Sequence, residues 1–370
     1  MASKIAAGFG SSDQSPVSVQ ELAKEPLIAV PQSFVRVDDD HLQPPNGLFD
    51  KTTTIPTFDM NKLVNIEEAT DLDDELERLH ITCQEWGIFQ LMNHGISSEL
   101  LEKLKHEIEE CFNLPLEEKM KYKVRPGEVE GYGTAVKTHG QKLDWGDRFY
   151  MIINPILRRK PHLFPQLPPS LRTILECYFL ELNKLAMTLV GLLARALKID
   201  KKEIKELVED GMQSVRMTYY PPCPQPDRVI GLTPHSDATA ITILHQLNGV
   251  DGLQIKKDGV WIPVNFVQDA FVVNVGDILE IMSNGVYKSV EHRVMVNSDK
   301  ERISLAMFFN LKFEAEIGPL ASLINPQNPP LFKRIPMEKY VKDFFSRRKL
   351  DGKTYLEQMM IKNEGTHTAP

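Results

Sequence analysis

The feature that most limits the fold is a change in residue pattern near residue 211. From there to about residue 313 the chain carries eight short β-branched or aromatic runs separated by turn residues: SVRMTYYP, VIGLTPH, AITILHQL, LQIKK, VWIPV, AFVVNV, SVEHRVMV and RISLAMFF. Asp258-Gly259, between the fourth and fifth runs, is typical of a tight β-hairpin. So many short strands in about a hundred residues favour a sandwich or barrel of the jelly-roll type.

The chain before residue 211 has mainly helical patterns. Leu72, Leu76, Leu79, Cys83 and Trp86 recur every three or four residues and so share one helix face. Further helices are predicted at about 101–112, 115–122 and 170–197, and short strands at 55–60 and 88–94. A capping box at 18–21 predicts a short helix near the start.

The remaining segments complete a prediction of the domain organisation. PQSFVR and LQPPNG are expected to be extended linkers, and a C-terminal helix is expected near 338–348, followed by a polar tail. We predict a mixed α/β protein whose jelly-roll core, a double-stranded β-helix, is flanked by a helical N-terminal region and a C-terminal helix. The expected divisions are an N-terminal extension (1–50), a helical region (51–210), the jelly roll (211–313) and a C-terminal helical segment with its tail (314–370).

Composition excludes several classes of function. The net charge is −8, with 42% hydrophobic and 25% charged residues, which disfavours nucleic acid or an anionic membrane as the main partner. Four scattered cysteines do not make a disulfide scaffold. The most apolar stretch, 185–199, is interrupted by Thr188 and Arg195, so no membrane span is expected. We expect a cytosolic, monomeric protein with a small-molecule partner.

The residues best suited to chemistry are His235, Asp237 and His292. On a strand, residues i and i+2 point to the same face, so His235 and Asp237 can converge, and a neighbouring strand can add His292. Two imidazoles and one carboxylate occupy three positions of an octahedral ion and leave three open, which suits non-heme Fe(II). The same ligands could bind zinc in a hydrolase, and spacing alone does not choose between the metals.

A second group of residues could bind a carboxylate. Arg302 and Ser304 share one strand face, ten or more residues after His292, and a guanidinium pairs well with both oxygens of a carboxylate. Tyr220 could add a hydroxyl. The alternatives are an edge-strand arginine in solvent and an interior tyrosine beside Pro221.

Together these motifs closely resemble the plant iron(II)/2-oxoglutarate-dependent dioxygenases. IPTFDM, CQEWGIFQLMNHGI, LEEKMKY and EGYGTAV are similar to that family's N-terminal region, and MTYYPPCPQPD, GLTPHSDATAITILHQ, GLQIKKDGVWIPV, VVNVGDILEIMSNGVYKSVEHRV and ERISLAMFF to its catalytic core. QKLDWGDRFYM and RKPHLFPQLP also suggest the senescence-related, codeine O-demethylase-like branch.

The resemblance implies roles for single residues. His235, Asp237 and His292 would bind Fe(II), with no catalytic side chain beyond the iron centre, while Arg302, Ser304 and Tyr220 would hold 2-oxoglutarate. Dioxygen would be the other co-substrate and ascorbate would support turnover. Thr218 stands where the family often has Asn, which removes an amide. The candidate substrate pocket comprises Tyr132, Phe149, Arg216, Phe308 and Asn310.

The expected function is oxidation of a small, largely apolar plant specialised metabolite, by hydroxylation or oxidative O-demethylation, with succinate and CO2 as co-products. The alternative from another class is a non-catalytic jelly-roll protein that binds a small molecule. His245 lies on a core strand where leucine is common. It could line the pocket, but we expect a core histidine whose ring nitrogens have hydrogen-bond partners.

Overall fold

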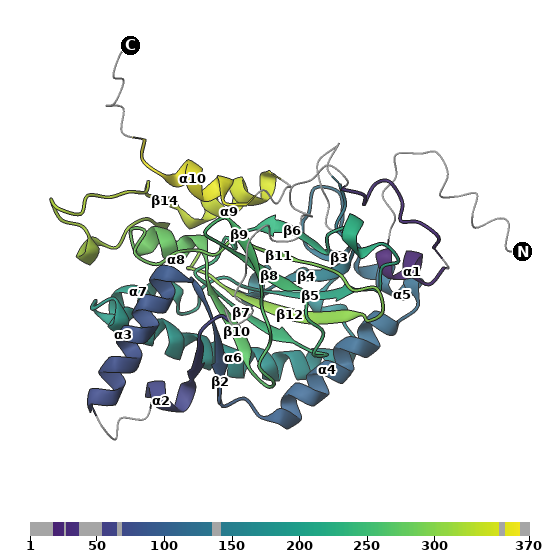
Figure 1. Cartoon of the computed structure of the whole chain (residues 1–370), viewed down its shortest axis with the longest axis horizontal. Helices are drawn as coiled ribbons and strands as arrows, with labels where there is room; N and C mark the ends of the chain where they lie inside the picture. Colours follow the sequence, from purple (N-terminus) through teal and green to yellow (C-terminus); the bar gives the residue numbers. More distant parts are fainter. Residues whose placement is uncertain are drawn as a thin grey trace, which may run out of the picture.

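The computed structural model describes residues 18–25, 27–36, 54–64, 69–134, 142–347 and 352–362. Two facing β-sheets lie at the centre, with helices on both sides (Figure 1). LQPPNG, which we expected to be a linker, lies outside the described residues. The four-part division of the chain stays a prediction. Strands from the 51–210 region and from the 211–313 region lie in one sheet.

The main sheet has eight strands. Their order is β1 (Thr57–Asp59), β2 (Ile88–Met92), β10 (Phe271–Val275), β7 (Ile241–Gln246), β12 (Arg302–Phe309), β5 (Gln213–Tyr220), β4 (Asp147–Asn154) and β3 (Gly131–Gly133). Only β1 and β2 pair in parallel among these neighbours. The helical N-terminal region therefore contributes strands to both edges of the sheet.

The smaller sheet has four strands, in the order β6 (Leu232–His235), β11 (His292–Val294), β8 (Leu253–Lys257) and β9 (Val260–Pro263). Asp258 and Gly259 join β8 to β9, both with positive φ (50° and 80°), which is the backbone of the predicted tight hairpin. Apolar side chains of both sheets meet in one cluster that includes Leu232, Ile255 and Val272. All eight predicted strands are present, and the jelly-roll core is confirmed.

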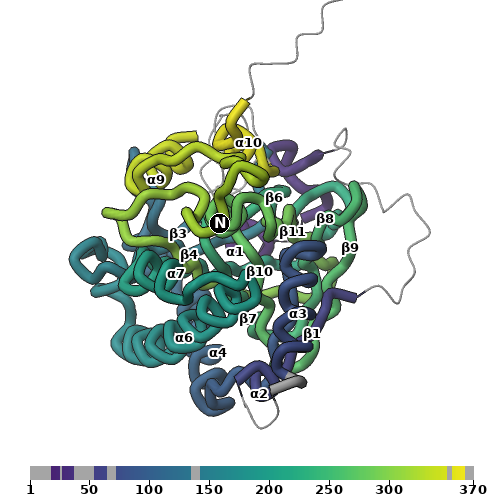
Figure 2. Tube along the Cα trace, turned by 90° about the vertical axis from the view of Figure 1, so that its left-hand side faces the viewer, coloured from purple at the N-terminus to yellow at the C-terminus, as the bar shows by residue number. Residues whose placement is uncertain are grey.

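Helices cover the main sheet on its outer side. The longest, α6 (Pro169–Ala196), packs against α4 (Ser98–Asn113) and α3 (Ala69–Glu85), and these elements lie opposite α9 (Met337–Ser346) and α10 (Thr354–Met359) in both views (Figures 1 and 2). Among the described residues, α6 is the one helix with the length and composition of a membrane span, and 56% of its most apolar window is buried. It is a core helix of this fold.

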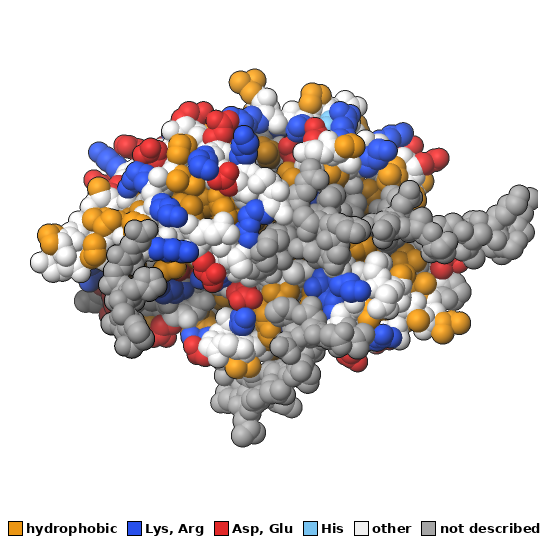
Figure 3. Space-filling view, turned by 90° about the horizontal axis from the view of Figure 1, so that it is seen from above, with side chains coloured by type: hydrophobic (Ala, Val, Ile, Leu, Met, Phe, Trp, Pro, Cys, Tyr) orange, Lys and Arg blue, Asp and Glu red, His pale blue; other side chains and the backbone are white. Residues whose placement is uncertain are grey.

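The shorter elements complete the chain. The remaining helices are α1 (Val19–Ala23), α2 (Met60–Val64), α5 (Leu116–Lys119), α7 (Lys201–Val208) and α8 (Asp277–Met282), with 3-10 turns at 120–122, 156–158, 164–166, 226–228 and 321–323 and a strand pair formed by β13 (Glu316–Ile317) and β14 (Ile335–Pro336). The Ser18 side chain caps α1, as the capping box predicts. On the face that carries α9 and α10, acidic and basic side chains are interspersed (Figure 3).

Two segments differ from expectation. PQSFVR is not a loose linker: Phe34 and Val35 are buried, and the Phe34 ring packs edge-on against Trp145 with centroids 5.1 Å apart. The segment is ordered because burying its apolar side chains against the protein stabilises it. The expected polar tail contains α10, which buries Tyr355 and Leu356.

Candidate metal centre

His235, Asp237 and His292 lie together between the two sheets. His235 ends β6 and is paired directly with His292 on β11, and Asp237 follows two residues after the end of β6. One donor atom from each lies within 4.8 Å of the others, and the Asp237 Oδ1 is 3.5 Å from His235 Nε2 and 3.8 Å from His292 Nε2. Among the described residues this is the group whose donors could hold a metal ion.

The histidine rings are oriented for metal binding. His235 Nδ1 lies 2.8 Å from the Thr233 carbonyl oxygen, and His292 Nδ1 lies 3.2 Å from that of Val290. A carbonyl oxygen only accepts, so each Nδ1 carries the proton and each Nε2 lone pair is available to a metal ion beside Asp237 Oδ1. Burial, followed by the neighbouring His235, lowers the pKa of His292 to about 4. The His292 ring is therefore neutral at physiological pH.

Asp237 has one oxygen for a metal and one held by the protein. Its Oδ2 accepts hydrogen bonds from the Thr242 hydroxyl at 2.7 Å and the Asn274 amide at 3.0 Å. Burial alone would raise the pKa of Asp237, but the two histidines and the Asn274 hydrogen bond lower it well below its ordinary value. The carboxylate is therefore ionised, and Oδ1 faces the histidine nitrogens.

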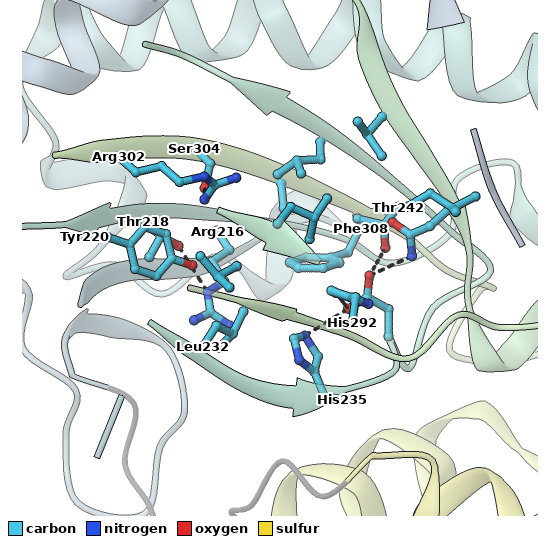
Figure 4. Close-up of a pocket in the computed structure, with 18 residues that line it drawn as sticks. Arg216, Thr218, Tyr220, Leu232, His235, Thr242, His292, Arg302, Ser304 and Phe308 are labelled. Carbon is cyan, nitrogen blue, oxygen red and sulfur yellow. Dashed lines mark hydrogen bonds and ion pairs between the residues drawn. The ribbon is translucent and has the colours of Figure 1, made fainter. Parts of the chain in front are cut away.

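Arg302, Ser304 and Tyr220 form the other end of the site (Figure 4). Arg302 and Tyr220 are opposite each other on β12 and β5, and the guanidinium carbon lies 5.4 Å from the tyrosine ring centre. Arg302 Nη1 donates to the Ser304 hydroxyl at 3.2 Å, and Nη2 to Gln246 Oε1 at 3.4 Å.

The Arg302 guanidinium is buried without a carboxylate partner among the described residues. Its exposure is 2%, its Nε has no hydrogen-bond acceptor, and burial lowers its pKa. Asp251 interacts with this charge only from beyond ion-pair distance, and a buried charge without a carboxylate in direct contact is costly, so this position is suited to a ligand that brings one. The donors present fit a ferrous ion at one end of the cavity and the far carboxylate of 2-oxoglutarate at the other.

A cavity of about 560 Å³, including its opening, connects the two ends. Both histidines, Asp237, Arg302, Ser304 and Tyr220 line it, together with Arg216 and Phe308. Thr218, the departure from the family pattern, also lines it, and its hydroxyl accepts a hydrogen bond from Arg216 Nε at 3.2 Å. Most of the other lining side chains are aliphatic: Ile88, Leu232, Leu244, Leu253, Val272, Val294 and Ala306.

The other three candidate pocket residues lie outside this cavity. Phe149 is paired with Met217, and both side chains belong to the hydrophobic core on the helix-covered face of the main sheet. Phe149 therefore points away from the cavity. Tyr132 is directed to the N-terminal segment, where its hydroxyl donates to Asp147 and Ser18. Asn310 would share the strand face of Phe308 if β12 continued, but β12 ends at Phe309. The Asn310 N–H instead donates to the Met212 carbonyl.

Sequence reasoning missed the residues that support the candidate metal ligand Asp237. Asn274 is the one polar residue of the buried strand β10, and Thr242 lies between two buried isoleucines in the first half of β7. That signal was available, because buried polar groups need partners. His245 packs beside Tyr178 and Phe271, as expected for a core histidine. The expectation that its ring nitrogens have hydrogen-bond partners is wrong for Nδ1, which is buried without one.

Comparison with known proteins places this chain in a family. Residues 211–311 match the 2OG-Fe(II) oxygenase superfamily, and residues 55–170 match the family described as non-haem dioxygenase in morphine synthesis N-terminal. The chain is 50% identical to Protein SRG1 of Arabidopsis thaliana (93% of this chain, 96% of that protein). It is 46% identical to codeine O-demethylase of Papaver somniferum, with the same shares covered.

A solved structure shows the same architecture. The crystal structure of JOX2 in complex with 2OG, Fe and JA superposes with a TM-score of 0.84 at 35% identity, covering 94% of this chain and 99% of that one. The fold, the His-Asp-His donor set and the two matched stretches of sequence all indicate the same family. The chain belongs to the 2OG-Fe(II) oxygenase superfamily and is a dioxygenase that uses Fe(II) and 2-oxoglutarate.

Proposed function

We propose that His235, Asp237 and His292 bind the ferrous ion and that Arg302, Ser304 and Tyr220 hold the C5 carboxylate of 2-oxoglutarate. The observation that carries this proposal is the buried Arg302 guanidinium, without a carboxylate partner among the described residues, in the same cavity as the three converging ligands. When bound, iron and 2-oxoglutarate supply the activation of dioxygen, and succinate and CO2 are released.

The side chains of this chain contribute orientation and exclusion of water. Asp237 keeps one oxygen for the metal because Thr242 and Asn274 hold the other. The aliphatic lining of the cavity limits the space open to water, as is typical of small-molecule sites. Arg216, held by Thr218, is placed to donate a hydrogen bond to an oxygen of the substrate.

We propose a small, largely apolar plant specialised metabolite as substrate, oxidised by hydroxylation or by oxidative O-demethylation. The apolar lining and Phe308 support an aromatic or aliphatic body, and the similarity to codeine O-demethylase supports demethylation. Hydroxylation of a methoxyl carbon gives a hemiacetal that breaks down to formaldehyde and a free hydroxyl, so one reaction type accounts for both outcomes.

The test is mass spectrometry of plant metabolite extracts incubated with the protein, Fe(II), ascorbate and 2-oxoglutarate in air. We expect a product lighter by CH2 or heavier by one oxygen, with one succinate released for each product molecule. An Asp237→Ala variant should give neither. Binding of a metabolite without product or succinate would instead favour a non-catalytic binding protein. A cytosolic location and a monomeric state remain proposals that rest on composition alone.

A further inference from the structure

The strand that carries His235 lies at the edge of the smaller sheet. β6 has only four residues, it pairs with β11 alone among the strands that the structure describes, and the pairing register shifts between His292 and Val294. An edge strand this short positions a side chain poorly by itself, because few ladder hydrogen bonds hold it. The outer edge is instead contacted by segments from both ends of the described chain.

The C-terminal contact involves Gly352. Its N–H donates to the Pro234 carbonyl at 3.1 Å, and its carbonyl accepts from the Ser236 N–H at 3.3 Å, so the chain near residue 352 pairs with the backbone on both sides of His235. These two hydrogen bonds fix the backbone of residues 234–236, at the end of β6.

The N-terminal contact is made by a buried ion pair. Arg36 Nη2 lies 2.9 Å from Asp144 Oδ1 and 2.8 Å from the Thr233 hydroxyl, and the side chains of Arg36 and Asp144 are 6% and 4% exposed. Asp144 Oδ1 also accepts from the Thr233 hydroxyl at 2.5 Å and from its backbone N–H at 3.2 Å. Thr233 is therefore fixed through both its side chain and its backbone.

Thr233 is also the residue that orients His235. Its carbonyl oxygen accepts the Nδ1 proton of His235 at 2.8 Å, which turns Nε2 towards Asp237. A continuous series of contacts thus runs from Arg36 through Asp144 and Thr233 to the imidazole. Displacement of the Thr233 backbone would move this acceptor and rotate the ring.

We propose that Arg36 is a positioning residue for the iron ligand His235, acting through Asp144 and Thr233. This inference rests on the proposed ligand role of His235. Arg36 lies outside both stretches that match the family, 55–170 and 211–311, so the N-terminal segment contributes to the metal centre although it supplies no ligand. Groups that orient metal ligands typically change metal affinity about 10- to 100-fold when removed.

The test compares Thr233→Val with Thr233→Ser. Valine has nearly the shape of threonine but lacks the hydroxyl that contacts both Arg36 and Asp144, whereas serine keeps it. Fe(II) affinity is measured anaerobically by equilibrium dialysis of the full chain. We expect at least about 10-fold weaker iron binding for Thr233→Val, affinity near wild type for Thr233→Ser, and unchanged 2-oxoglutarate affinity at saturating iron. Arg36→Gln should weaken iron binding in the same direction.

A remote core variant separates positioning from general destabilisation. Ile108→Val, in α4, removes one buried methyl group and should lower Tm without changing iron affinity. The proposal is overturned if Thr233→Val binds iron as tightly as wild type, or if Ile108→Val weakens binding equally. If the wild-type chain itself does not bind one iron ion, the proposed function fails first, which distinguishes the two results.

Discussion

Replacing Thr242 by valine removes one of the two hydrogen bonds that hold the outer oxygen of Asp237. The hydroxyl donates to Oδ2 at 2.7 Å, and the Asn274 amide donates to the same atom at 3.0 Å. Because both Thr242 and Asp237 are buried, water does not replace the lost donor easily. The carboxylate then gains freedom to rotate, and its Oδ1 spends less time facing the histidine nitrogens.

The expected magnitude follows from the strength of such bonds. A hydrogen bond to a charged group contributes about 1.5–3 kcal/mol. If most of this is lost from the metal-bound state, Fe(II) affinity falls about 10- to 100-fold, the range seen when supporting groups of metal sites are removed. Thr242→Ser keeps the hydroxyl and should remain close to wild type. Asn274→Leu should show a loss of similar size.

The assay is a titration of the metal-free protein with Co(II), whose absorption reports coordination by nitrogen and oxygen ligands. The protein is kept at a pH where His292 is neutral. The reasoning is refuted if Thr242→Val binds the metal as tightly as Thr242→Ser. It is also refuted if both variants are weakened equally.

Three further predictions concern other residues. Arg302→Lys keeps the charge but loses the two-pronged guanidinium, so the KM for 2-oxoglutarate should rise about 10-fold or more with metal affinity unchanged; an unchanged KM would exclude Arg302 as the anchor. Arg216→Met should raise the KM for the substrate about 10-fold without altering 2-oxoglutarate dependence, as measured by steady-state kinetics. Burial lowers the pKa of His245 to about 4 from 6.5, so below pH 6.5 the unfolded chain binds a proton that the folded chain does not, and stability is lost as the pH falls. Urea denaturation should show about 2 kcal/mol of this loss at pH 5 and a smaller loss in His245→Leu.

Strand patterns made the core of the site predictable from sequence. The two-residue period along β12 puts Arg302, Ser304 and Phe308 on one face, and all three line the cavity. The direct pairing of His235 with His292 was not predictable, because the register between β6 and β11 depends on contacts between residues 57 positions apart in the sequence.

Residues whose position depends on tertiary packing were beyond prediction. Phe149 lies on the core side because the register of β4 on β5 pairs it with Met217, and a shift by one residue would have placed it in the cavity. Arg36 contacts Asp144 and Thr233 from a segment whose Phe34 packs on Trp145 and whose backbone bonds to Leu143 and Arg228. Neither contact has a periodic signature in the sequence.

The most direct test of the iron and 2-oxoglutarate assignment is anaerobic visible spectroscopy. Fe(II) added with 2-oxoglutarate should produce a weak charge-transfer band that saturates at one iron per chain. The band should be lost in His292→Ala and recovered only at higher 2-oxoglutarate in Arg302→Lys. A wild-type protein without this band, or a band that persists unchanged in His292→Ala, would contradict the assignment of these residues to the metal centre.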